Sequence, residues 1–367
     1  MRILLVNPLD YRYGTTYRAR MFAESFKRLG LDVDYVEANS SDNSENAISV
    51  KQGDNIIGYF SGSLRRSLLC FFRKYDILFI ENFTPLSLSS LIAAKLRMKT
   101  IIVDWDAFEF IFQKTFLRKI LTFLTELICP YCVDYIISPS QHLIDSVKKR
   151  GIHKISQVPH FINTSLFRPE ESSRVKIREK MSWEGKRVIC YLCAFNPGGI
   201  RDLRIILEAM KLVISRIQDA CLLLIGEGSC ENEVIKLLDQ HAIKNYHILG
   251  IKQQNLVAEY INAADMGIIY LQNDLGSAMR TSIKLLVYLS MNKPVIGYIT
   301  GESRDALGRF IVSCEANPES LAERIIEAAN SGCVFEGARD YIVKNYSFEA
   351  APDFLREILK KAGKKCA

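Results

Sequence analysis

The chain lacks several features that would place it outside the class of soluble globular proteins. None of its apolar runs reaches the roughly 18 residues that a membrane-spanning helix needs. The first segment, MRILLVNPLDYRYG, turns polar after six residues, so we expect no signal peptide. The ten cysteines show no spacing typical of a disulfide framework, which indicates a reducing compartment. We therefore expect a cytoplasmic protein.

Two pairs of cysteines with the spacing Cys-x-x-Cys raise the question of a metal or redox site. Cys129 and Cys132 could bind a metal, but no second pair and no histidine cluster lies near them in the sequence. Cys190 and Cys193 lie in an expected strand, in which residues three apart point to opposite faces. We interpret this second pair as core residues, and we expect neither a metal site nor a cofactor.

The length and charge of the chain limit its domain organisation and its partners. A chain of 367 residues exceeds what one hydrophobic core usually serves, so we expect two domains. The formal net charge of +7 suits anionic partners such as nucleotide phosphates or an acidic membrane surface. This charge is too modest to indicate nucleic-acid binding by itself, and we expect no nucleic-acid partner.

Strand and helix patterns alternate along the whole chain. Residues 2–7 form an expected buried strand, a helical pattern follows from about residue 15, and residues 33–36 form the next strand. Such a unit implies a parallel sheet with right-handed crossovers. Further strands are expected at 76–80, 100–103, 134–138, 187–193, 221–225, 246–250, 266–270 and 294–298, and further helices at 87–96, 202–216 and 283–291 and from about 231 and 256. Two such series predict an α/β protein with two Rossmann-like domains facing a cleft.

The most informative segment is RTSIKLLVYLSMNKPVIGY, residues 280–298. It opens with two cations four residues apart, Arg280 and Lys284, at an expected helix start. Both could reach one phosphate group, and the helix N-terminus would add its own partial positive charge. An apolar helix face follows, and Asn292 and Lys293 then lead into a buried strand that begins with Pro294.

This segment resembles the donor-site signature of family-4 glycosyltransferases, which have the GT-B fold. The stretch QVPHFINTSLFRPE at 157–170 resembles the interdomain linker of that family, and the tail at 340–361 resembles its closing segment. The resemblance implies an acceptor-side domain at 1–160, a linker at 161–172 and a nucleotide-sugar-binding domain at 173–345. It also implies a C-terminal helix at 346–367 that folds back towards the first domain.

The resemblance implies a retaining, metal-independent transfer of a sugar from a UDP or GDP carrier. The acceptor would be a glycan or a lipid-linked molecule in surface polysaccharide or glycolipid assembly. Where the family has two glutamates that contact the donor, this chain has Met279 and Val287. The alternative is therefore a catalytically weak GT-B subunit that binds or scaffolds an active partner. A sugar-nucleotide epimerase on the same fold would need more clustered acid and base residues than the sequence offers.

The candidate site residues follow from strand ends and from the resemblance. Glycines at expected strand-end loops allow close approach of the backbone to a nucleotide. Asp106 follows an expected strand end, where functional groups collect in open α/β sheets, and the resemblance implies that it faces the transferred sugar. The donor candidates are Gly14, Thr15, Gly199, Arg201, Gly226, Glu227, Gly250, Ile251, Arg280, Ser282 and Lys284, and the catalytic candidates are Asp106, Arg280 and Lys284.

Two segments carry a possible membrane function. In residues 64–73, one helical face is apolar, and Arg65, Arg66 and Arg73 are expected to lie opposite or beside it. A basic amphipathic stretch of this kind can lie in an anionic lipid interface. Residues 108–128 are richer still in Phe and Leu, and for them we slightly favour ordinary core packing with a basic rim. Together the segments predict a peripheral site on an anionic membrane surface.

Overall fold

The computed structural model describes residues 1–10, 15–39, 47–53, 56–113, 115–250, 254–279, 281–332 and 335–363. The chain divides into two compact units. Unit 1 comprises Met1–Phe161 and Phe348–Ala367, and unit 2 comprises Ile162–Ser347. None of the described helices combines the length and the apolarity that crossing a membrane requires.

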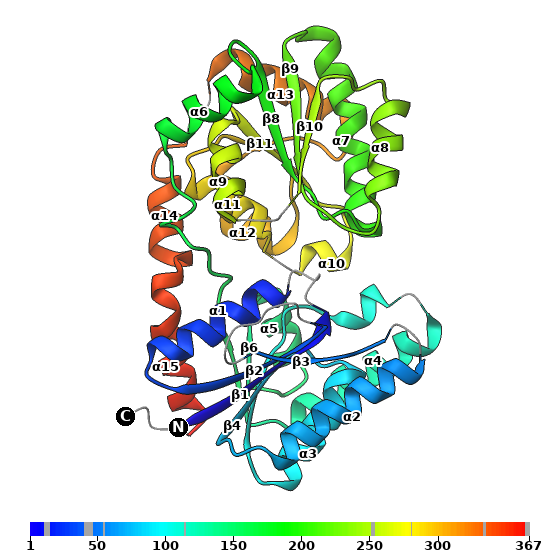
Figure 1. The fold of residues 1–367 in the computed structure, drawn as a ribbon, viewed down its shortest axis with the longest axis vertical. Helices are drawn as coiled ribbons and strands as arrows, with labels where there is room; N and C mark the ends of the chain where they lie inside the picture. The colour runs from blue at the N-terminus through cyan, green and yellow to red at the C-terminus, as the bar shows by residue number, and fades with distance from the viewer. Residues whose placement is uncertain are drawn as a thin grey trace. The chain divides into compact units, whose positions relative to one another are not determined.

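Unit 1 is built on a seven-stranded sheet in the order β3-β2-β1-β4-β5-β6-β7, and its strand pairs are parallel (Figure 1). The strands are β1 (Arg2–Asp10), β2 (Asp32–Ala38), β3 (Ala47–Val50), β4 (Ile77–Glu81), β5 (Thr100–Asp104), β6 (Tyr135–Ser138) and β7 (Ile155–Gln157). The helices are α1 (Thr15–Arg28), α2 (Ile56–Phe72), α3 (Pro85–Leu96), η1 (Glu109–Phe112), α4 (Phe116–Ile128), η2 (Cys129–Tyr131), α5 (Gln141–Lys148), η4 (Phe348–Ala350) and α15 (Ala351–Lys361). The parallel sheet and the expected strands of this half are confirmed, whereas the short strands β3 and β7 were not anticipated.

The core of unit 1 explains why α1 and α15 lie side by side (Figure 1). Phe22 and Phe26 of α1 both stack edge-on against Phe79 of β4, with ring centroids 5.3 Å apart. Leu355 and Leu359 of α15 belong to the same buried cluster. The C-terminal helix therefore closes the core of the sheet that the N-terminus begins.

Unit 2 holds a six-stranded sheet in the order β10-β9-β8-β11-β12-β13, and its strand pairs are parallel as well. The strands are β8 (Arg187–Leu192), β9 (Ala220–Ile225), β10 (Tyr246–Leu249), β11 (Met266–Tyr270), β12 (Val295–Tyr298) and β13 (Val312–Ser313). The helices are α6 (Glu171–Met181), α7 (Pro197–Arg216), α8 (Glu231–Gln240), α9 (Gln254–Ala263), α10 (Leu275–Ala278), α11 (Ile283–Ser290), α12 (Gly301–Leu307), η3 (Gly308–Phe310), α13 (Pro318–Ser331) and α14 (Ala338–Tyr346). Two parallel sheets with covering helices confirm the two Rossmann-like domains.

Two details of unit 2 test the sequence prediction closely. Cys190 and Cys193 pack into two different core clusters, which confirms that they point to opposite faces of β8. The prediction that helix α7 begins near residue 202 is wrong, because α7 begins at Pro197. The Asn196 side chain accepts a hydrogen bond from the backbone N–H of Gly199 (2.9 Å) and so caps the helix before its two glycines.

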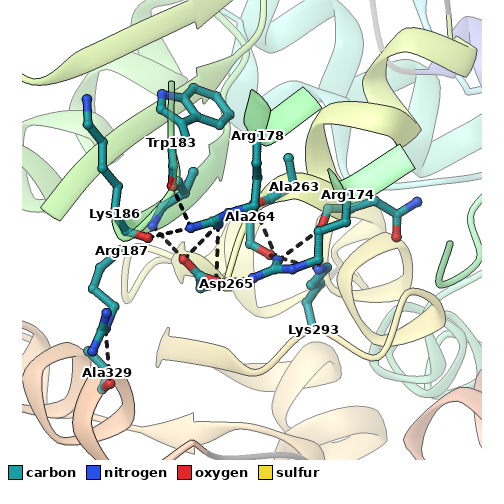
Figure 2. A network of polar contacts seen from close by, with 12 residues as sticks. Arg174, Arg178, Trp183, Lys186, Arg187, Ala263, Ala264, Asp265, Lys293 and Ala329 are labelled. Carbon is teal, nitrogen blue, oxygen red and sulfur yellow. Dashed lines mark hydrogen bonds and ion pairs between the residues drawn. The ribbon is translucent and has the colours of Figure 1, made fainter. Parts of the chain in front are cut away.

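A network of polar contacts attaches α6 to the start of β11 (Figure 2). Arg174 donates to the Asp265 carboxylate at 2.6 Å, and Arg178 lies 3.3 Å from both oxygens of that carboxylate. Asp265 also accepts the backbone N–H of Val188 at 2.7 Å, which ties the network to β8. One carboxylate therefore joins a helix to two strands of the sheet.

Lys293 completes this network from the segment that looked most informative in the sequence (Figure 2). Its ammonium donates to the carbonyls of Asn262 and Ala264, each at 2.8 Å, where α9 ends. A lysine in this position satisfies terminal helix carbonyls. Burial is the main cause that lowers the pKa of Lys293 to about 8. Lys293 thus holds the C-terminal end of α9 next to β12.

Candidate functional site

The donor candidates of unit 2 gather at the carboxyl ends of its parallel strands. Gly226 and Glu227 directly follow β9, Gly250 follows β10, and Gly199 lies in the first turn of α7 after β8. In open α/β sheets this edge is where ligands bind. Gly14, Ile251 and Arg280 lie outside the described residues. Thr15 is the first residue of α1, and its side chain is not described.

Three of the glycines are explained by contacts inside the protein. A Cβ atom on Gly226 would lie 1.7 Å from the Cys193 carbonyl oxygen, and one on Gly199 would lie 1.9 Å from that of Ala194. Gly228 has a φ of +152°, and its Cβ would lie 2.4 Å from the Phe195 oxygen. The loops after β8 and β9 therefore press backbone against backbone. Gly250 is different, because a Cβ there would meet only the Glu227 carboxylate, at 4.0 Å.

Lys284 is the candidate with the most specific surroundings. It is the second residue of α11, and its ammonium donates to the Tyr191 hydroxyl at 3.3 Å. The same ammonium lies 4.5 Å from the centroid of the Tyr191 ring, a cation–π geometry. Tyr191 is fully buried in β8, so the lysine is directed to the β8 strand. Neighbouring Ser282 precedes α11, and its backbone N–H donates to the Ser303 hydroxyl at 3.0 Å.

Sequence patterns did not reveal the groups around this lysine. Burial raises the pKa of the Cys193 thiol to about 11, while the charge of Lys284 acts against this shift and that of Asp202 adds to it. Tyr191 and Cys193 thus lie around Lys284, and the charge of Asp202 acts on the same thiol. Tyr191 and Cys193 belong to an apolar strand, which is why periodicity marks them only as core.

Arg201 is held by an ion pair. Its guanidinium lies 2.6 Å from the Asp274 carboxylate, whose other oxygen accepts the backbone N–H of Ser277 at 2.8 Å and caps α10. Burial would raise the pKa of Asp274, but the hydrogen bonds from Ser277 and Arg201 outweigh it and lower this pKa. A phosphate at Arg201 would therefore compete with Asp274 for the same cation.

The two positions where the resemblance implies glutamate are apolar in the structure as well. Val287 is 6% exposed and belongs to the core cluster of unit 2. Met279 ends α10 as its C-cap residue. Neither position offers a carboxylate to a ligand, and Val287 is committed to packing.

Unit 1 contains a cluster of charged groups at the carboxyl ends of β4 and β5. Glu81 and Asp104 lie side by side in register, and Arg18 of α1 binds Asp104 through two nitrogens at 2.6 and 3.0 Å. Arg18 also donates to the carbonyls of Val158 and Pro159 at 2.8 and 2.7 Å. Burial, followed by the charge of Asp104, raises the pKa of Glu81 well above its usual range. Burial is also the main cause that raises the pKa of Asp104, while the charge of Arg18 and its hydrogen bond oppose this rise.

Asp106 and His160 form a carboxylate–imidazole pair next to this cluster. The His160 Nε2 atom lies 3.3 Å from Asp106 Oδ1, and both side chains are largely buried. The backbone N–H of Asp106 donates to the Asn82 side chain at 2.9 Å, and Asn82 in turn donates to Glu109 at 3.0 Å. The structure thus fixes the candidate Asp106 from two sides. The sequence indicates Asp106 as a candidate and allows His160 to reach the cleft, but a lone histidine is more often structural.

Helix α4 buries polar residues and exposes apolar ones, which is the reverse of the expected core packing. Its buried residues are the polar Thr122, Thr125 and Glu126. Its exposed large apolar residues are Phe116, Leu117, Ile120, Leu121, Phe123, Leu124, Leu127 and Ile128. The slight preference for core packing of 108–128 is therefore wrong for α4. The polar stripe faces inward because Glu126 accepts the backbone N–H of Glu109 at 2.6 Å.

The apolar face of α4 belongs to a larger surface. α3 packs against both α2 and α4 (Figure 1). Exposed apolar side chains on α2 and α3 are Phe60, Leu64, Leu68, Phe71, Phe72, Leu88, Ile92 and Leu96. We call this set, together with the exposed residues of α4, the apolar face. Exposed apolar surfaces of this size on a soluble fold usually mark an interaction site.

Arg66 corrects one detail of the membrane hypothesis. It was expected on the polar rim of α2, but it is fully buried, because the stripe Gly62, Arg66, Cys70 faces inward. Within the described part of the chain, its three guanidinium nitrogens have no hydrogen-bond partner. Burial lowers the pKa of Arg66 to about 10. Only Arg65 and Arg73 of the three arginines can face solvent.

Glu126 gives unit 1 a pH dependence that can be measured. Burial is the main cause that raises its pKa to about 8, and the charge of Glu109 adds to it, while the backbone N–H groups of Glu109 and Phe110 and the Trp105 side chain oppose it. In the unfolded chain the pKa would be about 4.3. Between these values the folded state binds one proton more than the unfolded state, so stability falls as the pH rises.

We predict that the wild type loses a few kcal/mol of unfolding free energy between pH 5 and pH 8 and that Glu126→Gln does not. The variant should therefore gain stability over the wild type at pH 8. The amide keeps an acceptor for the Glu109 N–H and removes the titration. Urea unfolding of wild type and variant at both pH values measures the difference, and Glu357→Gln, at an exposed site of the same unit, serves as control. An identical pH dependence in wild type and Glu126→Gln would contradict this assignment.

Comparisons with known proteins agree with the geometry of the two sheets. Residues 186–331 match a family model described as "Glycosyl transferases group 1". Among curated proteins no sequence matches the chain. HepE of Anabaena in complex with UDP and glucose superposes with a TM-score of 0.77 at 11% identity, covering 98% of this chain and 99% of HepE.

Two further solved structures share the architecture. A glycosyltransferase from Rickettsia africae has a TM-score of 0.73 at 16% identity, and the match covers 99% of this chain and 98% of that one. The UDP-GlcNAc 2-epimerase from Methanocaldococcus jannaschii has a TM-score of 0.61 at 13% identity, covering 98% and 99%. The chain thus has the GT-B fold, and its residues 186–331 match the family model of the group 1 glycosyltransferases.

Proposed function

We propose that the chain is a family-4 glycosyltransferase that moves a sugar from a UDP or GDP carrier to a glycan or lipid-linked acceptor. The reaction would be retaining and metal-independent and would serve surface polysaccharide or glycolipid assembly. The observation that supports it best is Lys284, which the buried Tyr191 holds at the start of α11, inside the matched domain. HepE, which shares the fold, is described in complex with UDP-glucose.

Negative charge develops on the diphosphate as the sugar leaves. A positioned cation and a helix N-terminus stabilise that charge, and both act more strongly where water is excluded. In this proposal Lys284 and the first N–H groups of α11 hold the diphosphate, and Arg280 assists them. Gly199, Gly226 and Gly250 let the backbone approach the donor. Arg201 also binds the donor when a phosphate replaces Asp274 as the partner of its guanidinium.

Asp106 is the catalytic proposal in unit 1. His160 lies against its carboxylate and Asn82 holds its backbone N–H, so the carboxylate is presented in one orientation. A carboxylate held in this way can accept a hydrogen bond from a sugar hydroxyl. The charge of the neighbouring cluster is balanced internally by Arg18 and Asp104, which leaves Asp106 as the carboxylate suited to a substrate.

The second candidate function is a catalytically weak GT-B subunit that binds a nucleotide or scaffolds an active partner. Met279 and the buried Val287 favour it. They stand where the resemblance implies glutamates, and their apolar side chains cannot form hydrogen bonds to donor hydroxyls. Each buried donor hydroxyl that is left without a hydrogen-bond partner costs about 1–3 kcal/mol of binding free energy. Such a subunit would bind nucleotide but would not release sugar.

We predict that Lys284→Ala weakens binding of whichever of UDP and GDP the wild type binds by about tenfold or more, the loss of one hydrogen bond to a charged group. Titration calorimetry measures the affinity. Lys211→Ala, an exposed lysine on α7 in the same unit, is the matched control and should bind as wild type does. Unchanged affinity in Lys284→Ala would refute the phosphate role of this lysine.

We further propose that the protein is cytoplasmic and docks peripherally on the inner face of the cell membrane. The apolar face would enter the lipid interface, and Arg65, Arg118 and Lys119 on its helices would attract anionic head groups. A lipid-linked acceptor would then be within reach of unit 1.

Co-sedimentation with vesicles tests this docking. Wild type should bind vesicles that contain phosphatidylglycerol, and binding should fall with salt because the attraction is screened. The double variant Phe116→Ser, Leu117→Ser removes the two most exposed large apolar residues of α4 and should bind about tenfold more weakly. Leu212→Ser in unit 2 should leave binding unchanged. Equal partitioning to neutral and anionic vesicles would contradict the electrostatic contribution.

A further inference from the structure

A groove lies between the edge strand β3 and helix α2 of unit 1. Two adjoining cavities of about 600 and 620 Å³ form it, and both are lined by Ser49, Lys51 and Arg65. Periodicity in the sequence does not predict this groove, because one of its walls is the short strand β3, which was not anticipated. None of the donor or acceptor candidates that the structure describes lines it.

The two ends of the groove differ in chemistry. One end is polar and is also lined by Asn39, Gln52 and Ser61. The other end is apolar and is also lined by Ile48, Val50, Leu68, Leu69 and Phe72. The cations lie where the two ends meet. This order of polar, cationic and apolar walls matches a molecule with an anionic head and a hydrocarbon body.

The charge of the groove favours an anion. Arg73, at the apolar end, is paired with Asp34 at 2.9 Å. Lys51 and Arg65 form no ion pair with any described residue, and no described residue that lines the groove is acidic. Arg66, next to Arg65 in α2, adds a buried positive charge without a hydrogen-bond partner among the described residues. Positive potential of this kind attracts a phosphate.

The polar end is held in place by its own contacts. The Asn39 side chain donates to the Gln52 carbonyl at 2.9 Å and accepts the Gln52 N–H at 2.8 Å. Gln52 packs against α2 at Gly62, where a Cβ would lie 3.1 Å from the Gln52 Cβ. These contacts fix the segment that carries Lys51 against the helix that carries Arg65. The backbone positions that carry the two cations are therefore fixed relative to each other before any ligand arrives.

The apolar end identifies the kind of occupant. Leu68 and Phe72 line the groove and are also 46% and 74% exposed members of the apolar face. A hydrocarbon chain can thus pass from the groove onto that face without crossing a polar rim. A free phosphate would leave this end unused. We propose that the groove binds the phosphate head group of a single anionic phospholipid, whose acyl chains lie on the apolar face.

This inference deepens the membrane docking proposed above, so its test must work without a membrane surface. Monomeric dihexanoyl phosphatidylglycerol, below its critical micelle concentration, is the probe, and ligand-observed NMR measures its affinity for the full chain. Arg65→Ser and Lys51→Ser should each weaken binding roughly tenfold, as expected for one hydrogen bond to a charged group. Lys148→Ser, at an exposed lysine on α5 that does not line the groove, should bind as wild type does.

Three results would overturn the groove as a phospholipid site. They are equal affinity for dihexanoyl phosphatidylcholine, unchanged binding by Arg65→Ser and Lys51→Ser, and equal affinity for inorganic phosphate, which would leave the apolar wall without a role. Vesicle binding without binding of the monomeric lipid would likewise overturn the groove site while leaving the docking proposal intact. Binding of the monomeric lipid without vesicle binding would support the site and refute the docking.

Discussion

The buried ion pair between Arg18 and Asp104 is the interaction on which the functional end of the first sheet depends. Arg18 joins α1 to β5 through Asp104, and it joins both to the backbone at Val158 and Pro159, directly before His160. Breaking such a pair by removing one partner costs about 3–5 kcal/mol, because the other charge remains buried. The pair therefore fixes the segment that presents His160 to Asp106.

The cations of this protein fall into two groups by what lies against them. Arg18 is neutralised by the buried Asp104, and Arg174 and Arg178 by the partly buried Asp265, so these three cations serve the fold. Lys51 and Arg65 have no ion-pair partner among the described residues and line a groove. Net charge alone does not separate the groups. The proposed binding roles follow from the second group and from Lys284, whose ammonium lies 4.5 Å from the centroid of the Tyr191 ring.

The sequence predicts most of the fold because buried parallel strands leave a strong signal. β9, with the sequence ACLLLI, is fully buried, and such an apolar run has few alternative structures. The start of α7 was missed because its Pro-Gly-Gly sequence resembles a loop, while Asn196 caps it. β3 and β13 are too short to show a period. Local sequence patterns therefore predict an element correctly where its burial and its intrinsic propensity favour the same structure.

The site is less predictable, because its contacts join residues that are distant in the chain. Asp106 was found from its place after a strand, but His160 approaches it only once the sheet is assembled. The prediction for α4 was wrong for another reason. Periodicity shows that α4 has an apolar stripe, but it does not show which stripe faces inward. Here the polar stripe faces inward because Glu126 binds the backbone at Glu109, and Arg66 is likewise buried on the inner stripe of α2.

Release of nucleotide from a panel of UDP- and GDP-sugars by the wild-type protein tests the central claim, glycosyl transfer, most directly. The account predicts that one donor releases its nucleoside diphosphate and that a glycan or lipid-linked acceptor accelerates this release. It also predicts that Asp106→Asn slows release by about 100-fold or more, while nucleotide affinity, which the proposal assigns to unit 2, stays unchanged. Binding of a nucleotide without release from any donor would contradict glycosyl transfer and leave the chain as a catalytically weak binding subunit.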